Sequence, residues 1–260
     1  MPNVLDHYVT SAPNHQNALD IFQGQWTSRL PDGGQGLNAG QTPLFEDPRV
    51  TWAIEKLGGV QDNTVLELGP LEGGHSYMLE NAGVKSVLAL ESNTNAFLRC
   101  LIVKEILRLK KVHFLAGDFR PFLSSDGQHF DVIFASGVLY HMTDPIRLLF
   151  DISRRCRKVF LWTHYYDAAL LEQNEVVRNR LGPAQNLDFE GLRYEMHTYD
   201  YDISLNWSGF CGGSATSCAW LTRGSILGAL AHFGFKEIDI AFEQFDHPNG
   251  PCFAIVASRD

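Results

Sequence analysis

An acidic residue and a glycine turn stand together in residues 64–76, TVLELGPLEGGHS. Glu67 lies near the end of a predicted buried strand, and Gly69 opens the bend that leads into a helix. Glycines permit a tight turn without side-chain bulk, and a helix N-terminus offers free N–H groups to a ligand. Glu91 ends the next predicted strand, where a carboxylate can bind ribose hydroxyls. This spacing predicts a site for a nucleoside cofactor.

Two classes of nucleoside cofactor fit a strand, a glycine turn and an acid. A nicotinamide dinucleotide requires G-x-G-x-x-G, and Leu71 breaks that fingerprint at its middle glycine. The Glu67 carboxylate would repel a pyrophosphate, whereas it would attract the cationic amino group and sulfonium of S-adenosylmethionine. The charge argument therefore favours the methyl donor over the dinucleotide.

Side chains for methyl transfer are expected in the loops YHMTD (140–144) and THYYD (163–167), after the fourth and fifth predicted strands. Displacement at a sulfonium needs an aligned acceptor and, for a hydroxyl or protonated amine, a base. His141 and His164 are the candidate bases, because histidine titrates near neutral pH. Tyr140 and Tyr165 are candidate substrate contacts. Each of these residues also has an alternative role. Tyr140 could pack beside the adenine ring, His141 could cap the following helix, and His164 could be a structural histidine of the interior.

A metal site is not predicted. His141, Asp144 and His164 offer ligand atoms, but their spacing is not diagnostic of any metal. The five cysteines form no C-x-x-C pair and are expected to be buried reduced thiols of a cytoplasmic protein: Cys100, Cys156, Cys211, Cys218 and Cys252.

Strand and helix patterns alternate through the middle of the chain. Strands are predicted at 64–69, 86–91, 112–117, 130–137 and 158–163, and helices at 46–58, 76–83, 95–110 and 144–156. The strands are continuous apolar runs, which indicates a parallel sheet buried on both faces by helices. Such a doubly wound sheet binds its ligand at the carboxyl ends of the strands. A helix at 222–235 and a pair of strands at 235–245 and 252–259 complete the chain.

Two regions fall outside this alternation. Residues 1–45 are polar and turn-rich, and Trp26 there fits either a helix anchored on the core or a substrate-contacting lid over the site. The segment at about 165–219 contains a predicted helix at 167–181 and many aromatic residues, which form either a substrate wall or the core of a cap. We therefore expect a 1–45 extension and a 46–260 catalytic domain that carries this insertion.

Four motifs in order resemble the class I S-adenosylmethionine-dependent methyltransferases: LELGPLEGG (66–74), the acid Glu91, AGDF (116–119) and FDVIFASGVLYHMTDP (130–145). The resemblance implies a Rossmann-like α/β fold, a doubly wound, mostly parallel seven-stranded sheet with an antiparallel C-terminal strand and helices on both faces. GVLYH, with the Trp and Gly-Phe elements near 220 and 234, is also similar to the wobble-uridine carboxymethyltransferases of tRNA. Leu71 departs from the family's middle glycine, which is expected to alter the grip on the cofactor without forbidding binding.

By this resemblance, S-adenosyl-L-methionine is the cofactor and seven residues contact it. They are Glu67, Gly69 and Gly73 on the methionine side, Glu91 on the ribose, Asp118 and Phe119 on the adenine, and Ser136 near the amino-acid end.

The formal net charge of −9 over 260 residues makes nucleic acid a disfavoured partner, because an acidic surface repels phosphates. No apolar run reaches the ~20 residues of a membrane span, and no signal peptide is visible. Three functions stay open: methyl transfer to an oxygen or nitrogen of a small molecule in the cytoplasm, methyl or carboxymethyl transfer to an RNA base, and non-catalytic nucleoside binding. The oligomeric state is open.

Overall fold

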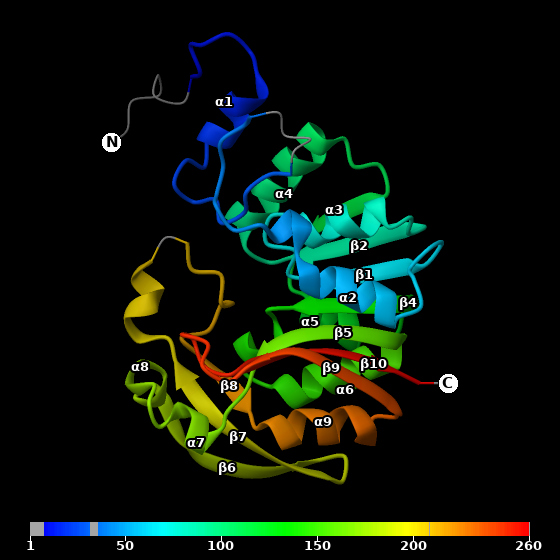
Figure 1. The fold of residues 1–260 in the computed structure, drawn as a ribbon, viewed down its shortest axis with the longest axis vertical. Coiled ribbons are helices and arrows are strands. Elements are labelled where there is room, and N and C mark those ends of the chain that lie inside the picture. The colour runs from blue at the N-terminus through cyan, green and yellow to red at the C-terminus, as the bar shows by residue number, and fades with distance from the viewer. Residues whose placement is uncertain (1–7, 32–35, 208, 260) are drawn as a thin grey trace.

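A seven-stranded sheet forms the centre of the protein in a computed structural model that describes residues 8–31, 36–207 and 209–259 (Figure 1). In spatial order its strands are β3 (Val112–Ala116), β2 (Ser86–Glu91), β1 (Thr64–Leu68), β4 (Phe130–Ser136), β5 (Cys156–His164), β10 (Cys252–Ser258) and β9 (Glu237–Gln244). Strand β10 is antiparallel to both of its neighbours, and the other pairs are parallel. The predicted fold is confirmed.

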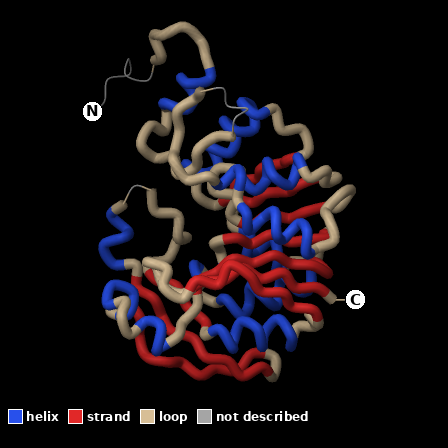
Figure 2. The backbone as a smooth tube through the Cα atoms, in the orientation of Figure 1, coloured by secondary structure: helices blue, strands red, loops and turns tan. Residues whose placement is uncertain are grey.

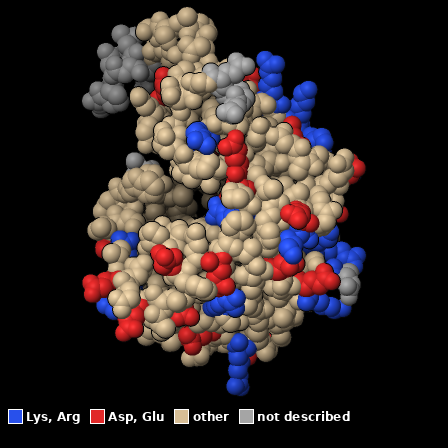
Figure 3. All heavy atoms as spheres, in the orientation of Figure 1, with Lys and Arg blue, Asp and Glu red and all other residues tan. Residues whose placement is uncertain are grey.

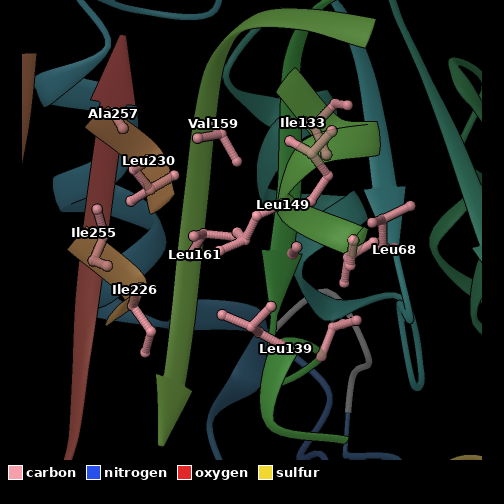
Figure 4. Packing of buried hydrophobic residues seen from close by; sticks show 14 of the residues in the cluster. Leu68, Ile133, Leu139, Leu149, Val159, Leu161, Ile226, Leu230, Ile255 and Ala257 are labelled. Atoms are coloured by element: carbon pink, nitrogen blue, oxygen red, sulfur yellow. The ribbon is translucent and has the colours of Figure 1, made fainter. Parts of the chain in front are cut away.

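Helices cover both faces of this sheet. One face carries α2 (Pro48–Lys56), α3 (Gly74–Asn81) and α4 (Thr94–Leu107), and the other carries α5 (Phe119–Ser124), α6 (Pro145–Arg155) and α9 (Arg223–His232). Successive strand residues point to opposite faces, so Val65 packs in the first layer while Leu66 and Leu68 pack in the second. Figure 4 shows this second layer, where Leu149 and Leu230 meet the strands. Burial on both faces explains the continuous apolar runs.

A second, three-stranded antiparallel sheet belongs to the insertion, which we call the cap (residues 167–221; Figure 2). Its strands are β6 (Leu181–Phe189), β7 (Leu192–Asp200) and β8 (Ser217–Leu221), and it also contains α7 (Ala168–Leu171), α8 (Glu175–Arg178) and the 3-10 helix η5 (Asp202–Asn206). The single helix predicted at 167–181 is wrong, because the Asn174 side chain accepts a hydrogen bond from the Val177 N–H and starts α8 separately. Tyr199 and Trp220 stack at 4.9 Å in the core of the cap.

The N-terminal segment, described at residues 8–31 and 36–46, lies beside α4 and contains α1 (His15–Asp20) and the 3-10 helix η3 (Leu44–Glu46). The Trp26 indole donates a hydrogen bond to the Leu19 carbonyl at 2.9 Å, and both residues belong to the apolar cluster that contains Val103 of α4. Trp26 therefore anchors this segment. Residues 1–7 and 32–35 of the predicted extension lie outside the described residues. Of the helices that the structure describes, none has the length and apolar character needed to span a membrane.

Candidate functional site

A cavity of about 1000 Å³ opens at the carboxyl ends of β1, β2, β4 and β5, between the N-terminal segment and the cap. Figure 3 shows a hollow in this region. The N-terminal segment contributes Thr27, Ser28, Thr42 and Leu44 to its lining, and the cap contributes Cys211, Gly213, Ser214 and Ala215. A ligand in the cavity would thus contact three parts of the chain that are far apart in sequence.

The glycine turn and Glu91 lie side by side in the wall of the cavity. The backbone of Gly69 has a φ of +64°, and a Cβ there would lie 3.2 Å from a Val138 methyl group. Leu71 also has a positive φ of 56°, so this residue adopts the left-handed conformation usually reserved for glycine. Its N–H donates to Glu91 Oε2 at 3.2 Å, while the Asn93 N–H donates to Oε1 at 2.8 Å. Burial raises the pKa of Glu91, although these backbone donors favour the charged form.

Glu67 and Gly73 lie behind the turn and do not line the cavity. The Ser76 hydroxyl donates to the Glu67 carboxyl group, which is almost completely buried, and burial raises the pKa of that carboxyl. Gly73 has a φ of +78°, and a Cβ there would lie 3.0 Å from the Phe114 ring. Both residues thus shape the turn from its inner side.

Asp118, Phe119 and Ser136, which were predicted to contact the cofactor, line the same cavity as Gly69 and Glu91. Asp118 caps α5 by accepting the Arg120 N–H at 2.9 Å, and it also pairs with the Arg120 guanidinium at 2.6 Å. That guanidinium lowers the pKa of Asp118. Ser136 ends β4, beside Trp162 of β5.

His141 ends the 3-10 helix η4 (Leu139–His141), directly after β4, and lines the cavity. Its Nδ1 atom lies 2.7 Å from the Tyr201 hydroxyl, which donates to the Gly212 carbonyl at 2.9 Å. A hydroxyl has a single proton, so this network assigns the imidazole proton to Nδ1 and leaves a lone pair on Nε2. Burial lowers the pKa of His141 to about 3, and the nearby His164 adds to the shift. The ring is therefore neutral at physiological pH.

His164 ends β5 and is brought into the same cavity. Its Nδ1 atom donates to the Gly250 carbonyl at 2.8 Å, which leaves Nε2 as the unprotonated nitrogen. Its ring stacks on Trp220 at 5.4 Å, and the Tyr140 ring meets it edge-on at 4.7 Å. Burial lowers the pKa of His164 to about 4. Tyr140, a predicted substrate contact, also lines the cavity.

Two predicted substrate contacts lie away from the cavity lining. Tyr165 is fully buried on the sheet face that carries α6 and α9, and its hydroxyl donates to Glu243 at 3.1 Å. Side chains alternate along an extended chain, so the neighbours His164 and Tyr165 point to opposite faces. Trp26 is held in the N-terminal segment. The aromatic residues of the insertion that were considered for a substrate wall also lie outside the lining: Tyr194, His197, Tyr199, Tyr201, Trp207 and Phe210.

One group among the described residues has convergent metal-ligand atoms, namely His164, His247 and Cys252, which lie within 4.8 Å of one another. Two features oppose a cation there. His247 Nδ1 accepts the Asn249 N–H at 3.1 Å, which places the proton of the neutral ring on Nε2, and the Arg49 guanidinium acts electrostatically on all three groups. The alternative set of His141, Asp144 and His164 is not gathered, since Asp144 caps α6 instead.

Several cavity residues were not identified from the sequence, among them Arg49, His75, Trp162 and His247. Arg49 belongs to a helix that precedes the first strand. His247 belongs to the segment DHPNGP, whose residue types predict a hairpin turn and no binding role. Both reach the site through packing between distant segments, for which no local motif exists. Signals were available for Trp162, which lies two residues before His164 on β5, and for His75, which directly follows the glycine turn.

Comparisons with known proteins show similarity to methyltransferases in sequence and in fold. Residues 66–159 match the protein family described as "Methyltransferase domain". The chain is 29% identical over 111 residues to the tRNA U34 carboxymethyltransferase of Campylobacter hominis, covering 42% of this chain and 38% of that protein. It spans between 31% and 43% of the length of the curated relatives it matches.

Two solved structures share the fold. The N-terminal domain of EvdMO1 in the presence of SAH and D-fucose has a TM-score of 0.70 and 24% identity, with 94% of both chains covered. The 1,6-didemethyltoxoflavin-N1-methyltransferase of Burkholderia thailandensis, with 1,6-didemethyltoxoflavin and S-adenosylhomocysteine bound, has a TM-score of 0.52 and 15% identity. It covers 84% of this chain and 79% of its own.

Proposed function

We propose that this chain, a class I S-adenosylmethionine-dependent methyltransferase, transfers the cofactor's methyl group to an oxygen or nitrogen of a small-molecule acceptor. One observation carries the proposal. Five of the seven predicted cofactor residues and two neutral imidazoles, His141 and His164, line a single cavity of about 1000 Å³. A volume of this size fits the range of ligand pockets, at its upper end.

In this proposal the cavity residues bind the cofactor in a single orientation. Asp118 and Phe119 hold the adenine, Glu91 holds the ribose, and Gly69 with Ser136 holds the methionine end. When bound, S-adenosylmethionine supplies an electrophilic methyl group on a sulfonium. The remaining part of the cavity, beside Tyr140, His141 and His164, then receives the acceptor.

His141 is the proposed general base, because its Nε2 lone pair is unprotonated and the ring lines the acceptor part. Tyr201 and the Gly212 carbonyl hold Nδ1–H in place, so the ring is positioned before the acceptor arrives. A proton leaves the acceptor as the new bond to carbon forms, and Nε2 accepts it. His164 offers a second neutral nitrogen in the same cavity, with Nδ1 held by Gly250.

The choice of a small acceptor rests on charge and enclosure. The chain carries a net charge of −9, and in Figure 3 the hollow is bordered mostly by residues other than Lys, Arg, Asp and Glu, with a basic side chain at its edge. Two segments from distant parts of the chain, Thr27–Ser28 and residues 213–215, add to the walls of the cavity, which suits a small molecule. Hydroxylated sugars come first among candidates, since the EvdMO1 structure was obtained in the presence of D-fucose.

A tRNA acceptor is the second candidate, supported by the curated relatives named as tRNA U34 carboxymethyltransferases. The acidic balance and the partial coverage of those relatives weigh against it.

The test measures S-adenosylhomocysteine formed from S-adenosylmethionine with D-fucose and other sugars, nitrogen heterocycles, or unmodified tRNA. We expect turnover with at least one small acceptor and none with tRNA. The His141→Gln variant should lose turnover by about 100-fold or more, the usual contribution of a general base. Turnover with tRNA alone would overturn the small-molecule proposal, and full activity of His141→Gln would overturn the role of His141.

A further inference from the structure

We propose that Arg49 forms a carboxylate-binding subsite in the cavity and holds the α-carboxylate of the cofactor's methionine part. The inference rests on the cofactor direction given in the proposed function. Among the described lining residues, Arg49 and Arg120 alone carry an Arg or Lys side chain. Arg120 pairs with Asp118 at the adenine end, so Arg49 is the guanidinium available at the other end.

The Arg49 guanidinium is fixed on two sides. Its Nε donates to Asp47 at 2.9 Å and its Nη2 donates to the same carboxylate at 2.6 Å. Its Cζ atom lies 4.5 Å from the centroid of the Trp162 ring, so the planar group stacks on an aromatic face. Long side chains normally lose conformational entropy on binding, and a guanidinium held in advance avoids most of that loss.

One edge of the guanidinium stays available to a ligand. Nη1 makes no hydrogen bond to the described residues, and the side chain keeps 19% of its surface exposed while it lines the cavity. Asp47, by contrast, is nearly buried and divides its charge between Arg49 and His75 Nε2, which lies 2.9 Å away. The carboxylate of Asp47 thus orients Arg49 from behind without reaching the ligand space. A planar guanidinium with a free edge suits a carboxylate.

The position matches the amino-acid end of the cofactor. Trp162, under the guanidinium, pairs in the sheet with Ser136, and its carbonyl accepts the Gly137 N–H at 2.8 Å. Ser136 is the residue assigned to the amino-acid end. His75, the other partner of Asp47, follows the glycine turn by one helical residue and also lines the cavity. Arg49 therefore lies close to the place proposed for the α-carboxylate of the cofactor, beside the glycine turn.

The test compares S-adenosylmethionine with decarboxylated S-adenosylmethionine, which keeps the nucleoside, sulfonium and amino group. Titration calorimetry is run on the wild type, Arg49→Met and Arg49→Lys, with Arg120→Met as the matched control. We expect Arg49→Met to weaken binding of S-adenosylmethionine about tenfold or more, as for a lost charged hydrogen bond. Binding of the decarboxylated form should change by less than about twofold. Arg49→Lys, which keeps the charge and protects the fold, should give a smaller loss confined to S-adenosylmethionine.

The control should alter both affinities by the same factor, because Arg120 lies at the adenine end. Equal weakening of both ligands in the Arg49 variants would overturn the subsite and reduce Arg49 to a packing role. Unchanged binding of both would also overturn it and would assign the free edge to an anion on the acceptor. If the wild type binds neither ligand, the proposed function itself fails, and the subsite fails with it.

Discussion

The Nδ1 atom of His141 lies 2.7 Å from the hydroxyl oxygen of Tyr201. His141 follows the fourth strand of the central sheet, whereas Tyr201 belongs to the cap, so this contact joins the two parts at the cavity. A Cβ at Gly212 would lie 3.0 Å from the same nitrogen, which explains why a glycine supplies the carbonyl that Tyr201 binds. The cap thereby sets the tautomer of the proposed base.

Replacing Tyr201 by Phe tests this positioning. The variant removes the partner of Nδ1 and should lower kcat about 2- to 10-fold, the value of one hydrogen bond, with little change in the affinity for S-adenosylhomocysteine. Tyr199→Phe is the matched control, because it removes a hydroxyl from the same cap cluster, one that accepts from Arg180 at 3.3 Å. Initial rates at saturating cofactor provide the measurement. An equal loss in both variants would contradict the specific role of Tyr201.

The two cavity histidines predict a pH dependence of stability. Burial lowers the pKa of His164 from 6.5 to about 4, so the unfolded chain binds the proton between these values and the folded chain does not. The free energy of unfolding should therefore fall as the pH drops from 7 to 5, by about 2 kcal/mol for this one group. Urea denaturation at both pH values measures the fall. The His164→Gln variant should lack this pH-dependent part of the free energy of unfolding. The same pH dependence in the variant and the wild type would contradict the lowered pKa of His164.

Glu72 is expected to hold the N-terminal segment over the cavity. Its buried carboxylate accepts the Thr27 N–H at 2.9 Å and the Ser28 N–H at 2.7 Å, and it pairs with Arg99 at 3.3 Å. Glu72→Gln should lower the free energy of unfolding by about 1–3 kcal/mol and speed hydrogen exchange at Thr27 and Ser28.

The control for this change is Glu46→Gln, which breaks only the exposed pair with Arg29 at 3.5 Å and should leave the exchange of both amides unchanged. Slow exchange at Thr27 and Ser28 in Glu72→Gln would show that the segment is held by other contacts.

Two glycine substitutions should change stability in opposite directions. A Cβ at Gly74 would lie 2.7 Å from the Leu44 carbonyl oxygen, so Gly74→Ala must displace the N-terminal segment and should cost about 1–3 kcal/mol. Gly228 lies in α9 with open space around the added methyl group. Gly228→Ala should therefore stabilise the protein by up to about 1 kcal/mol through helix propensity. Thermal unfolding distinguishes them, and a stabilised Gly74→Ala would contradict the close approach.

The sequence predicts the central sheet well because its inner strands, such as β1, β4 and β10, are buried on both faces and carry continuous apolar runs. Residues 66–159 also match the family described as "Methyltransferase domain", and Gly69, Glu91, Asp118, Phe119 and Ser136, which the motifs single out, line one cavity. These residues stand at strand ends, where position along the chain determines position in space. Glu91 is the clearest example, since its carboxylate meets the glycine turn of the preceding strand.

Features that depend on contacts between distant segments are not predictable in this way. In β6 and β7 the apolar residues are interrupted irregularly by polar ones, so neither strand has a continuous apolar run and the three-stranded sheet is not visible from the pattern. Arg49 reaches the cavity only because Asp47 and Trp162 fix it there. Tyr165 and His164 are adjacent in sequence but face opposite sides of the sheet. Local patterns locate the strand ends, and packing decides which side chains meet.

The most direct test of the account is calorimetric titration of S-adenosylhomocysteine into the wild type and Glu91→Ala, with Glu237→Ala on the distant strand β9 as the control. We predict micromolar binding to the wild type and to Glu237→Ala, and a loss of about tenfold or more in Glu91→Ala, because a charged acceptor for the ribose is removed. Equal binding to all three proteins, or binding to none, would contradict the placement of the cofactor at the glycine turn and Glu91.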